Sequence, residues 1–571
     1  MNIQHFLEDA LTKDLLKVTG EHFPAIVKPA QRSEFGHYQA NGVMGAAKAL
    51  KRNPRELAQQ LLPNVETQVF DAEIAGPGFI NITLKTDFIA DGLLALRSDP
   101  LLGVTKQKLL KIVVDYSSPN LAKEMHIGHL RTTTIGDCIV RILEYLGHDV
   151  VRVNHVGDWG AQFGSLLAYM DELTENGEAL STELKDLERF YQAASKLFKE
   201  DRDFAEKARS YVVKLQSKDT KCMALWKQFI SESIRHSQAV YERFDITLTN
   251  DDIRAESAYN DDLPTVVEEL SGKEGLLVKS DGAKCVFLEE FKGKDQKPLP
   301  AIIQKSDGGY PYIATDLAAV RYRTNVLKAN KVLYVVGGEQ KLHLRQLFAV
   351  SQKVGYIRED QEFKHLPFGM VLKEDGSRFK TRDGADVKLI DVLDEAIERA
   401  LALVSKKNPK LSTSDKQKIA HVVGIGAIKY AELSKNRTTD YIFDWDRMLS
   451  FEGNTAPYLQ YSYTRIRSLF RRAGVNCLEE GKIKITEEAE IKLGIKILQF
   501  PEAIENSLED YQANVLCAYL YELSGLFNNF YETCPVLGSH NQTSRLVLCD
   551  LTSQIIKQGL ELLGITTVEQ M

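Results

Sequence analysis

The pattern of apolar and polar positions divides the chain into three parts. Residues 1–105 begin with a helical stretch and later carry a Gly-Pro-Gly turn followed by the apolar run "FINITL", which is typical of a strand. Beyond residue 415, nearly every segment repeats its apolar residues at helical spacing. The pattern therefore predicts a small N-terminal α+β domain over residues 1–105 and a C-terminal all-α helical bundle over residues 416–571.

Residues 106–415 alternate between strands and helices. "IVVDY" is a short β-branched run typical of a buried parallel strand; a helical pattern ending at Gly147 follows it, and then a second strand, "DVVRV". A strand, a helix and a strand in succession imply a parallel sheet. We therefore predict an α/β Rossmann-like domain with a parallel sheet, interrupted by a mostly helical insertion around residues 162–300.

Composition narrows the class of protein. A chain of 571 residues with 44% hydrophobic and 26% charged residues is long enough for three or four globular domains. The first residues are acidic and amphipathic, and no stretch of about 18 apolar residues occurs, so we expect neither a signal peptide nor a membrane span. The seven cysteines are scattered without a C-x-x-C pair, which indicates a reducing cytoplasm and argues against structural zinc.

Charge leaves the question of a nucleic-acid partner open. The net charge of −7 counts against such a partner, but total charge is a weak test for a large protein. The segment from Arg465 to Gly474, "RIRSLFRRAG", is basic. It is either a local nucleic-acid face on an acidic body or an ordinary solvated helix face.

The segment from Ser117 to Asp137, "SSPNLAKEMHIGHLRTTTIGD", carries the main candidate chemistry. Its chemically competent residues are Lys123, His126, Gly128 and His129. They stand where the first strand turns into a helix, and ligands of parallel sheets bind beyond the carboxyl ends of the strands. N–H groups at a helix start favour phosphate, glycine lets a ligand approach the backbone, and imidazoles donate to phosphate oxygens. The alternative is two ordinary histidines near a helix start.

A second basic segment is "KEDGSRFKTRDG". Its polar and charged side chains between and beside two glycines are Lys373, Arg378, Lys380, Thr381 and Arg382. A glycine-flanked basic loop is able to close over a triphosphate, and a solvated surface loop is the alternative. The G-x-x-x-x-G-K-[ST] motif does not occur in the sequence, which excludes a P-loop nucleotide triphosphatase.

These segments together resemble the class I aminoacyl-tRNA synthetases, the arginyl family in particular. The motifs that carry the resemblance follow the family order along the whole chain: "FGHYQANGVM", "GPGFINI", "SPNLAKEMHIGHLRTTTIGD", "VNHVGDWGAQFG", "YVVGGEQKLHLRQLF", "FGMVLKEDGSRFKTRDG" and "NTAPYLQYSYTRI". The resemblance implies an additional tRNA-binding domain at residues 1–105, the class I catalytic domain at 106–415 and an anticodon-binding bundle at 416–571.

The resemblance also implies an ATP-dependent reaction in two steps. The carboxylate of L-arginine attacks the α-phosphorus of ATP, which gives arginyl-adenylate and pyrophosphate; the arginyl group then moves to the terminal ribose of tRNA(Arg), releasing AMP. ATP is expected to enter with Mg²⁺, and no protein-bound zinc is expected. The enzyme is expected to be a cytoplasmic monomer without membrane contacts. Such chemistry needs positioning and stabilisation of negative charge rather than a protein nucleophile.

Family residues that bind ATP correspond to positions in three segments of this chain. They are His126, Gly128, His129, Gly369, Met370, Val371 and Lys380. The "KMSKS" motif of most class I enzymes is replaced here by "RFKTR", and the arginyl family often compensates with a lysine ahead of the first histidine, which is the place of Lys123. The implied catalytic set is Lys123, His126, His129 and Lys380, and the division of labour between the two lysines stays open.

An arginine substrate needs acceptors for a guanidinium with five N–H donors. The family positions that hold the guanidinium correspond to Asp115, Tyr312 and Asp316, and those around the α-amino and carboxylate groups correspond to Ser118, Asn120 and Gln340. Tyr312 and Asp316 lie four residues apart, on one face if this segment is helical. Without the resemblance, Asp316 as a helix N-cap and Tyr312 as a core residue would be the simpler interpretation.

The family stretches that contact tRNA correspond to two groups of residues. Phe35, Tyr38 and Asn41 lie in the part of the N-terminal domain that contacts the tRNA elbow, and Tyr458, Tyr461, Arg465 and Tyr531 lie in the anticodon-binding bundle. Exposed aromatic and arginine side chains stack on unpaired bases. Packing in the core of a helical bundle is the alternative for each tyrosine.

Three other functions fit parts of the sequence. A class I synthetase for cysteine normally needs zinc ligands, and one for glutamate would need a basic pocket in place of Asp115 and Asp316. A small nucleotidylyltransferase shares the H-x-G-H chemistry but is much shorter and lacks the helical tail. A non-enzymatic tRNA-binding relative would not need Lys123 and both histidines.

Overall fold

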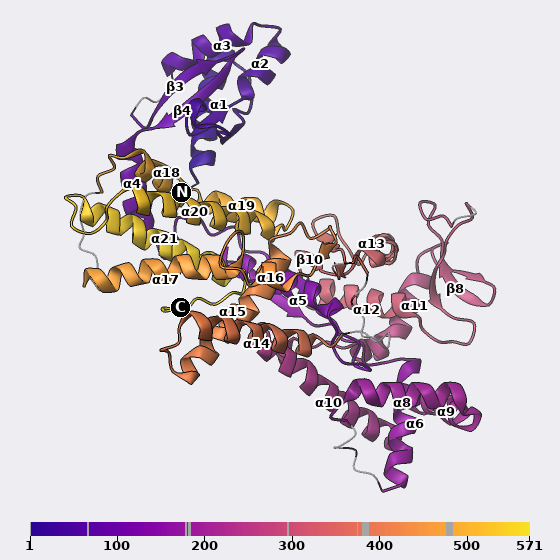
Figure 1. The fold of residues 1–571 in the computed structure, drawn as a ribbon. Coiled ribbons are helices and arrows are strands. Elements are labelled where there is room, and N and C mark those ends of the chain that lie inside the picture. The colour runs from indigo at the N-terminus through magenta and orange to yellow at the C-terminus, as the bar shows by residue number, and fades with distance from the viewer. Residues whose placement is uncertain are drawn as a thin grey trace. The chain divides into compact units, whose positions relative to one another are not determined.

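The computed structural model describes residues 2–64, 68–177, 180, 184–293, 296–373, 375–377, 379, 387–474 and 483–571 (Figure 1). The chain divides into two compact units. Unit 1 comprises Met1–Gln107, Val404–Gly426 and Leu449–Met571, and unit 2 comprises Lys108–Leu403 and Ala427–Met448.

A parallel sheet of four strands is the centre of unit 2. Its strands are β5 (Lys111–Asp115), β6 (Asp149–Val153), β10 (Lys331–Tyr334) and β11 (Glu362–His365), in the order β11-β10-β5-β6. All three pairings are parallel, which confirms the predicted fold class. The chain passes from β5 to β6 on one side, while β10 lies on the other. The topological switch point, where ligands of such sheets bind, is therefore between the carboxyl ends of β5 and β10.

Helix α5 (Gly128–Tyr145) follows β5 and packs on β5 and β6. It ends as predicted, because Gly147 adopts φ +89° and donates its N–H to the Glu144 carbonyl. The other elements of this part are α12 (Tyr312–Asn325), η5 (Gly338–Gln340), α13 (Lys341–Val354), β12 (Val371–Leu372), α14 (Leu389–Lys407), β13 (Tyr441–Ile442) and α16 (Trp445–Met448). The buried core between sheet and helices includes Val113, Leu317, Val320, Val332 and Leu347.

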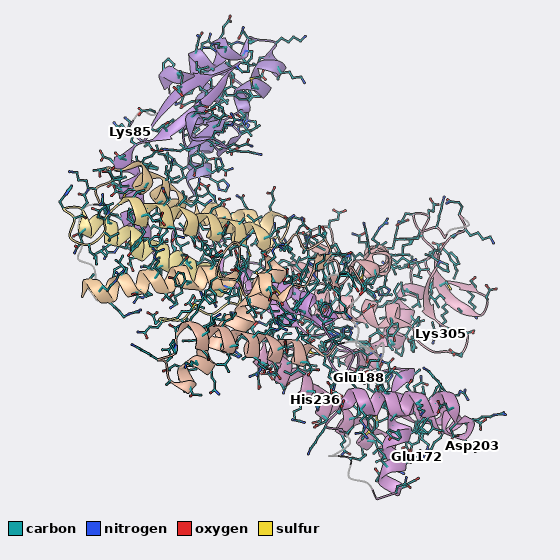
Figure 2. All side chains as sticks on the ribbon, in the orientation of Figure 1. Lys85, Glu172, Glu188, Asp203, His236 and Lys305 are labelled. Carbon is teal, nitrogen blue, oxygen red and sulfur yellow. The ribbon has the colours of Figure 1, made fainter. Side chains whose placement is uncertain are left out.

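Among its described residues, the insertion between β6 and β10 begins with four helices that share a core of their own. They are α6 (Ala161–Glu175), α8 (Leu187–Glu200), α9 (Arg202–Gln216) and α10 (Thr220–Arg243), marked in Figure 2 by Glu172, Glu188, Asp203 and His236. Phe163 and Phe190 both pack against Phe229 in this core. The structure confirms the predicted helical character of this part.

The last part of the insertion differs from the predicted helical pattern. After η3 (Asn250–Asp252), η4 (Glu256–Asp262) and α11 (Leu263–Ser271), an antiparallel sheet is formed by β7 (Val278–Ser280), β8 (Ala283–Val286) and β9 (Ala301–Gln304). The first hairpin turns at Asp281 and Gly282, with φ angles of +49° and +82°. Asp-Gly favours such a turn, but strands of three or four residues are too short to show a clear periodicity.

The N-terminal part of unit 1 is an antiparallel sheet with helices, as predicted. Its strands are β1 (Val27–Pro29), β2 (Tyr38–Ala40), β3 (Phe70–Ala75) and β4 (Phe79–Leu84), in the order β1-β2-β4-β3. Its helices are α1 (Ile3–Thr19), η1 (Ser33–Phe35), α2 (Gly42–Leu50), α3 (Pro54–Leu61), η2 (Leu62–Asn64) and α4 (Thr86–Arg97). Gly76 and Gly78 form the predicted turn between β3 and β4, with positive φ angles.

The C-terminal part of unit 1 is helical, as the apolar spacing predicts. Its helices are α17 (Ala456–Ala473), α18 (Glu488–Leu498), α19 (Phe500–Glu509), α20 (Ala513–Thr533) and α21 (Gln542–Leu562), preceded in the chain by α15 (Thr413–Leu433). Helix α20 packs on α18, α19 and α21, and α18 also packs on α4. Within the described part of the chain, no helix is both long enough and apolar enough to cross a membrane.

Candidate active site

The carboxyl ends of β5 and β10 meet at a backbone hydrogen bond, in which the Val335 N–H donates to the Asp115 carbonyl at 2.9 Å. The loop that leaves β5 therefore starts at the switch point and leads into α5. Its first residues include Ser117 and Ser118, whose φ angles are +67° and +46° although neither residue is glycine. This left-handed turn sets the direction of the segment that carries Lys123 and the two histidines.

His126 and His129 lie together at the start of α5. Their ring centroids are 4.2 Å apart. The Gly128 N–H donates to Nδ1 of His126, and the His126 N–H donates to Nδ1 of His129, both at 3.1 Å. Nδ1 of His126 is thus an acceptor, which assigns the proton of that neutral ring to Nε2, whereas Nδ1 of His129 also lies 3.2 Å from the His126 carbonyl oxygen. Burial and the neighbouring His126 lower the pKa of His129 to about 3, so this ring is a neutral donor.

Gly128 is required by the position of His126. A Cβ atom at residue 128 would lie 2.7 Å from Cε1 of the His126 ring. The glycine therefore leaves space for the histidine, a neighbour that only the structure reveals because the ring folds back over its own backbone. That Gly128 also lets a ligand approach the backbone stays a prediction.

The segment at the start of α14 forms backbone hydrogen bonds with the residues around His126. The Ile127 N–H donates to the Val387 carbonyl, and the Leu389 N–H donates to the Met125 carbonyl, both at 2.9 Å. Residues 387–389 follow the predicted basic loop directly. Of that loop, Arg378, Lys380, Thr381 and Arg382 lie outside the described residues. The backbone pairing places residues 387–389, which follow this loop in the chain, next to the segment that carries the histidines.

Lys123 is exposed, and its Nζ lies 4.5 Å from the centroid of the Tyr191 ring on α8. The alternative role, screening of Glu124, is not supported by the contacts of that carboxylate. Glu124 pairs with Lys388 at 3.2 Å and accepts the N–H of Leu187 at 3.2 Å. Lys388 also binds Asp186, the N-cap of α8, at 2.9 Å. The charge of Lys123 is therefore not neutralised by its neighbour in sequence.

Gly369 and Met370 lead into β12, whose Val371 and Leu372 pair with β13 in parallel. The Gly369 N–H donates to the Arg437 carbonyl at 3.0 Å, and the Met370 N–H donates to Asp440 at 2.6 Å. Strand β13 donates to the carbonyls of Met370 and Leu372. Alternation in a parallel pair then turns the N–H and carbonyl of Val371 away from β13. Of the three predicted residues, Val371 has the backbone groups best oriented to read a base.

The predicted acceptors for a guanidinium lie on α12. Tyr312 begins this helix and is 63% exposed, and Asp316 lies one turn further, so neither the core nor the N-cap interpretation holds. Asp316 accepts from Nε2 of His343 at 2.6 Å and lies 3.7 Å from Nε2 of His155. The Asp316 hydrogen bond raises the pKa of His343. These contacts leave a carboxylate and an exposed phenol side by side on one helical face.

Two acidic residues of this region were missed by the sequence analysis. Burial and, after it, the negative charges of Asp316 and Asp158 together raise the pKa of Glu256 to about 8. Burial also raises the pKa of Asp158, whose carboxylate accepts from the N–H and hydroxyl of Ser257. Glu256 stands in a region without periodicity, and only the fold brings it near α12. Asp158, Glu256 and Asp316 therefore form an acidic cluster.

Asp115 is not part of this acidic cluster. Its side chain is 6% exposed; one oxygen accepts from Nη2 of Arg323 at 2.6 Å, and the other accepts from Oγ of Ser118 at 2.9 Å. The prediction that Asp115 contacts the substrate guanidinium is corrected, because the guanidinium it holds belongs to the protein itself. A buried carboxylate with both oxygens bonded serves to position Ser118 instead.

The two remaining predicted residues of the arginine site have exposed side chains. Asn120 pairs with Gly157 in an isolated bridge, and its Oδ1 accepts the Ala122 N–H at 3.0 Å. Gln340 ends η5 directly after β10 and begins α13. Both therefore stand beyond the carboxyl ends of central strands, together with Ser118.

Three of the predicted tRNA contacts in the bundle share one surface of α17 and α20. Asn528 bridges two of them, because it donates to the Tyr458 hydroxyl at 2.9 Å and accepts from Arg465 at 3.3 Å. The Arg465 guanidinium lies 4.5 Å from the centroid of the Tyr531 ring. Tyr461 is 47% exposed and lines a hollow of about 340 Å³ with Arg465, Arg471 and Arg472. The core interpretation fails for Tyr461, and the surface is basic and aromatic.

The N-terminal group is divided by the structure. Phe35 ends η1 and is partly exposed, and Asn41 precedes α2 as its N-cap residue. Tyr38 is fully buried, and its hydroxyl donates to Glu502 on α19 at 2.7 Å. The prediction that Tyr38 contacts tRNA is therefore corrected: it is an internal residue. Strand alternation explains this, because Tyr38 and Ala40 of β2 both point into the core.

Among the residues that the structure describes, no group of three His, Cys, Asp or Glu side chains is arranged to hold a metal ion. The six described cysteines are all buried. A catalytic metal held by several protein ligands therefore has no candidate in this part of the chain.

Comparison with known families extends the same picture over the full length. The family described as "tRNA synthetases class I (R), catalytic domain" matches residues 94–445, the "DALR anticodon binding domain" matches residues 459–571, and the "Arginyl tRNA synthetase N terminal domain" matches residues 1–84. The three matches follow one another in the order of the N-terminal sheet, the parallel sheet and the helical bundle.

Relatives match from end to end. An arginine–tRNA ligase of Hahella chejuensis is 53% identical and one of Histophilus somni is 50% identical, each with both chains covered completely. The crystal structure of the arginyl-tRNA synthetase of Plasmodium falciparum superimposes with a TM-score of 0.87 at 32% identity, covering 100% of this chain and 99% of that one. The chain therefore belongs to the arginyl-tRNA synthetase family of the class I tRNA synthetases.

Proposed function

We propose that the residues gathered at the carboxyl ends of β5 and β10 carry out the reaction of this family: ATP-dependent ligation of L-arginine to tRNA(Arg) through an arginyl-adenylate. The observation that supports the assignment of the substrate is the acidic cluster of Asp158, Glu256 and Asp316, together with the exposed Tyr312 on the helix of Asp316. A glutamate substrate would meet repulsion there, whereas a permanently charged guanidinium with five donors matches several carboxylate acceptors.

The proposed partners of the guanidinium are Asp316 and Glu256 of the acidic cluster, together with Tyr312. Ser118, Asn120 and Gln340 stand at the strand ends and are the proposed partners of the α-amino and carboxylate groups. Asp115 acts through Ser118, which donates to it at 2.9 Å. This arrangement would hold the substrate at both ends and leave its carboxylate free to approach the α-phosphorus.

The nucleotide is proposed to lie across α5. His129 is neutral, and both histidines are proposed to donate through Nε2 and to stabilise charge that develops on phosphate oxygens. Lys123 and Lys380 are proposed for the β- and γ-phosphates, and Mg²⁺ is proposed to enter with ATP as part of the substrate. Gly369, Met370 and Val371 are the proposed adenine segment, with the Val371 backbone as its reading edge.

For the tRNA, Tyr458, Tyr461, Arg465 and Tyr531 are proposed to contact the anticodon arm, and Phe35 and Asn41 the elbow. Stacking on aromatic rings and arginine planes requires side chains that reach solvent, which Tyr461 does. We further propose a cytoplasmic monomer, with domains at residues 1–105, 106–415 and 416–571.

Amino-acid-dependent exchange of pyrophosphate into ATP tests the proposal. All twenty amino acids are tried, each with and without tRNA(Arg). Exchange with L-arginine alone among the amino acids is expected, followed by transfer to tRNA(Arg) when that tRNA is present. Exchange that requires cysteine or glutamate would assign the chain to another substrate. Tight tRNA binding without any exchange would indicate a non-catalytic relative.

A further inference from the structure

The turn after β5 holds two consecutive residues, Ser117 and Ser118, in the left-handed region at φ +67° and +46°. Glycine occupies this region freely, whereas residues with a Cβ are strained there. Strained conformations persist where the surrounding structure fixes them, and they concentrate at functional sites. The contacts that fix this turn are therefore of functional interest.

One of these contacts comes from the insertion. The hydroxyl of Tyr241, near the end of α10, lies 2.8 Å from Oγ of Ser117. The same oxygen accepts a hydrogen bond from Nδ2 of Asn154 at 3.0 Å, and either hydroxyl is able to donate in the bond between Tyr241 and Ser117. The Oδ1 atom of Asn154 in turn accepts the N–H of Ser118 at 3.0 Å. A single hydroxyl thus reaches both strained residues, one directly and one through an amide.

The network is buried and continues into α5. Ser117, Asn154 and Tyr241 are at most 4% exposed. Thr132 and Thr133 of α5 also bind Ser117. The Ser117 N–H donates to Oγ1 of Thr132 at 3.0 Å, and Oγ of Ser117 accepts from Oγ1 of Thr133 at 2.9 Å. Hydrogen bonds are strong in such a dry setting, and a partner left unpaired is costly.

We propose that Tyr241 is a positioning residue for the arginine site. It holds Ser117 and Ser118 in the left-handed conformation from which Ser118 and Asn120 face the substrate. Tyr241 is buried and does not touch the substrate; it acts through the turn. The inference rests on the proposed function, because Ser118 and Asn120 are assigned there to the α-amino and carboxylate groups.

Steady-state aminoacylation kinetics of the full-length Tyr241→Phe enzyme test this role. The variant removes one oxygen and keeps the ring. We expect KM for arginine to rise about tenfold, the change expected for one or two lost buried hydrogen bonds, while KM for ATP stays within about twofold. The matched control is Tyr211→Phe, which removes a buried hydroxyl bonded to Asp171 on the same insertion. It should lower Tm similarly and leave both KM values unchanged.

A second substitution asks whether the turn conformation is the reason. Ser117→Gly accepts the left-handed angle without strain, so the double variant Tyr241→Phe/Ser117→Gly should recover most of the arginine affinity. Lys328→Gly serves as the control, because Lys328 is also a non-glycine residue in the left-handed region, at φ +55°, but it is exposed. It should give no recovery in the Tyr241→Phe background.

The results separate this inference from the assignment of the site. Wild-type KM for arginine in Tyr241→Phe, equal losses for arginine and ATP, or no recovery with Ser117→Gly would each overturn the positioning role. Ser118→Ala and Asn120→Ala are measured in parallel. If both leave KM for arginine unchanged, the proposed substrate contacts are wrong, whatever Tyr241→Phe does.

Discussion

The backbone N–H of His126 lies 3.1 Å from Nδ1 of His129, and the two rings stand 4.2 Å apart at the start of α5. Nδ1 of His126 accepts the Gly128 N–H, which leaves Nε2 as the donor of that ring. This relationship turns two histidines near a helix start into a donor pair suited to phosphate oxygens.

Replacing His129 should therefore affect chemistry more than binding. His129→Ala is expected to lower arginine-dependent ATP–pyrophosphate exchange by about 10²- to 10³-fold, the usual loss for one transition-state donor, with a much smaller change in KM for ATP. His129→Gln, which carries an N–H at a similar reach, should retain part of the activity. The exposed His22→Ala is the control and should behave as wild type. A His129→Ala enzyme with near-normal exchange would remove the assigned role.

Glu256 should make arginine binding depend on pH. Its pKa of about 8 in the unliganded protein means that the carboxylate is mostly protonated at pH 6. Binding a guanidinium favours the charged form, so arginine affinity should rise with pH, by up to about tenfold per unit, and level off above pH 8. Calorimetry in two buffers with different protonation enthalpies should show release of a proton at pH 7.

Glu256→Gln should abolish this dependence and weaken binding at pH 8, and the exposed Glu268→Gln on α11 should change neither. The contribution of Glu256 to folding stability changes with pH in the opposite direction to arginine affinity. The folded-state pKa lies above the unfolded value, so the stabilisation present below about pH 4.5 is lost as pH rises toward 8. If arginine affinity does not change between pH 6 and pH 8, Glu256 is not part of the arginine site.

The two candidate triphosphate lysines can be separated by rapid-quench measurement of adenylate formation. Lys123→Ala should lower the rate sharply and leave arginine affinity unchanged, and Lys123→Arg should rescue it only in part, because the planar group displaces the charge. Lys380→Ala should cost less. The double variant should be non-additive if both lysines bind the same phosphates. Wild-type adenylate formation in Lys123→Ala would leave Lys380 as the triphosphate lysine.

The surface of α17 and α20 predicts which arginines contact tRNA. Arg465→Ala should weaken tRNA(Arg) binding by about 1 to 3 kcal/mol if a base stacks there, without changing ATP–pyrophosphate exchange at saturating tRNA. Arg467→Ala is the matched control, because Arg467 lies two residues further along the helix and pairs with Glu569 at 3.0 Å. The Arg465 variant should also lose discrimination against a tRNA with an altered anticodon. Unchanged affinity with a lower Tm would indicate a packing role instead.

Much of the fold follows from local sequence. The β-branched run of β5, the helical spacing after it and the left-handed Gly147 each carry a signal within a few residues, and all three appear as predicted. The strands β7–β9 carried no comparable signal, because runs of three or four residues are too short for periodicity to separate them from loops. The prediction of secondary structure was therefore wrong where the strands are shortest, at β7–β9.

By itself, the sequence determined the segments that hold the chemistry: His126 and His129 at a strand-to-helix turn, Tyr312 and Asp316 on one helical face, and a basic aromatic stretch around Arg465. Tertiary structure alone decided what each side chain contacts. Asp115 is taken by Arg323, Tyr38 by Glu502, and Glu256 joins Asp316 from a distant segment. Spacing along a chain fixes faces and turns, whereas burial and partners depend on residues separated by tens to hundreds of positions, which only packing brings together.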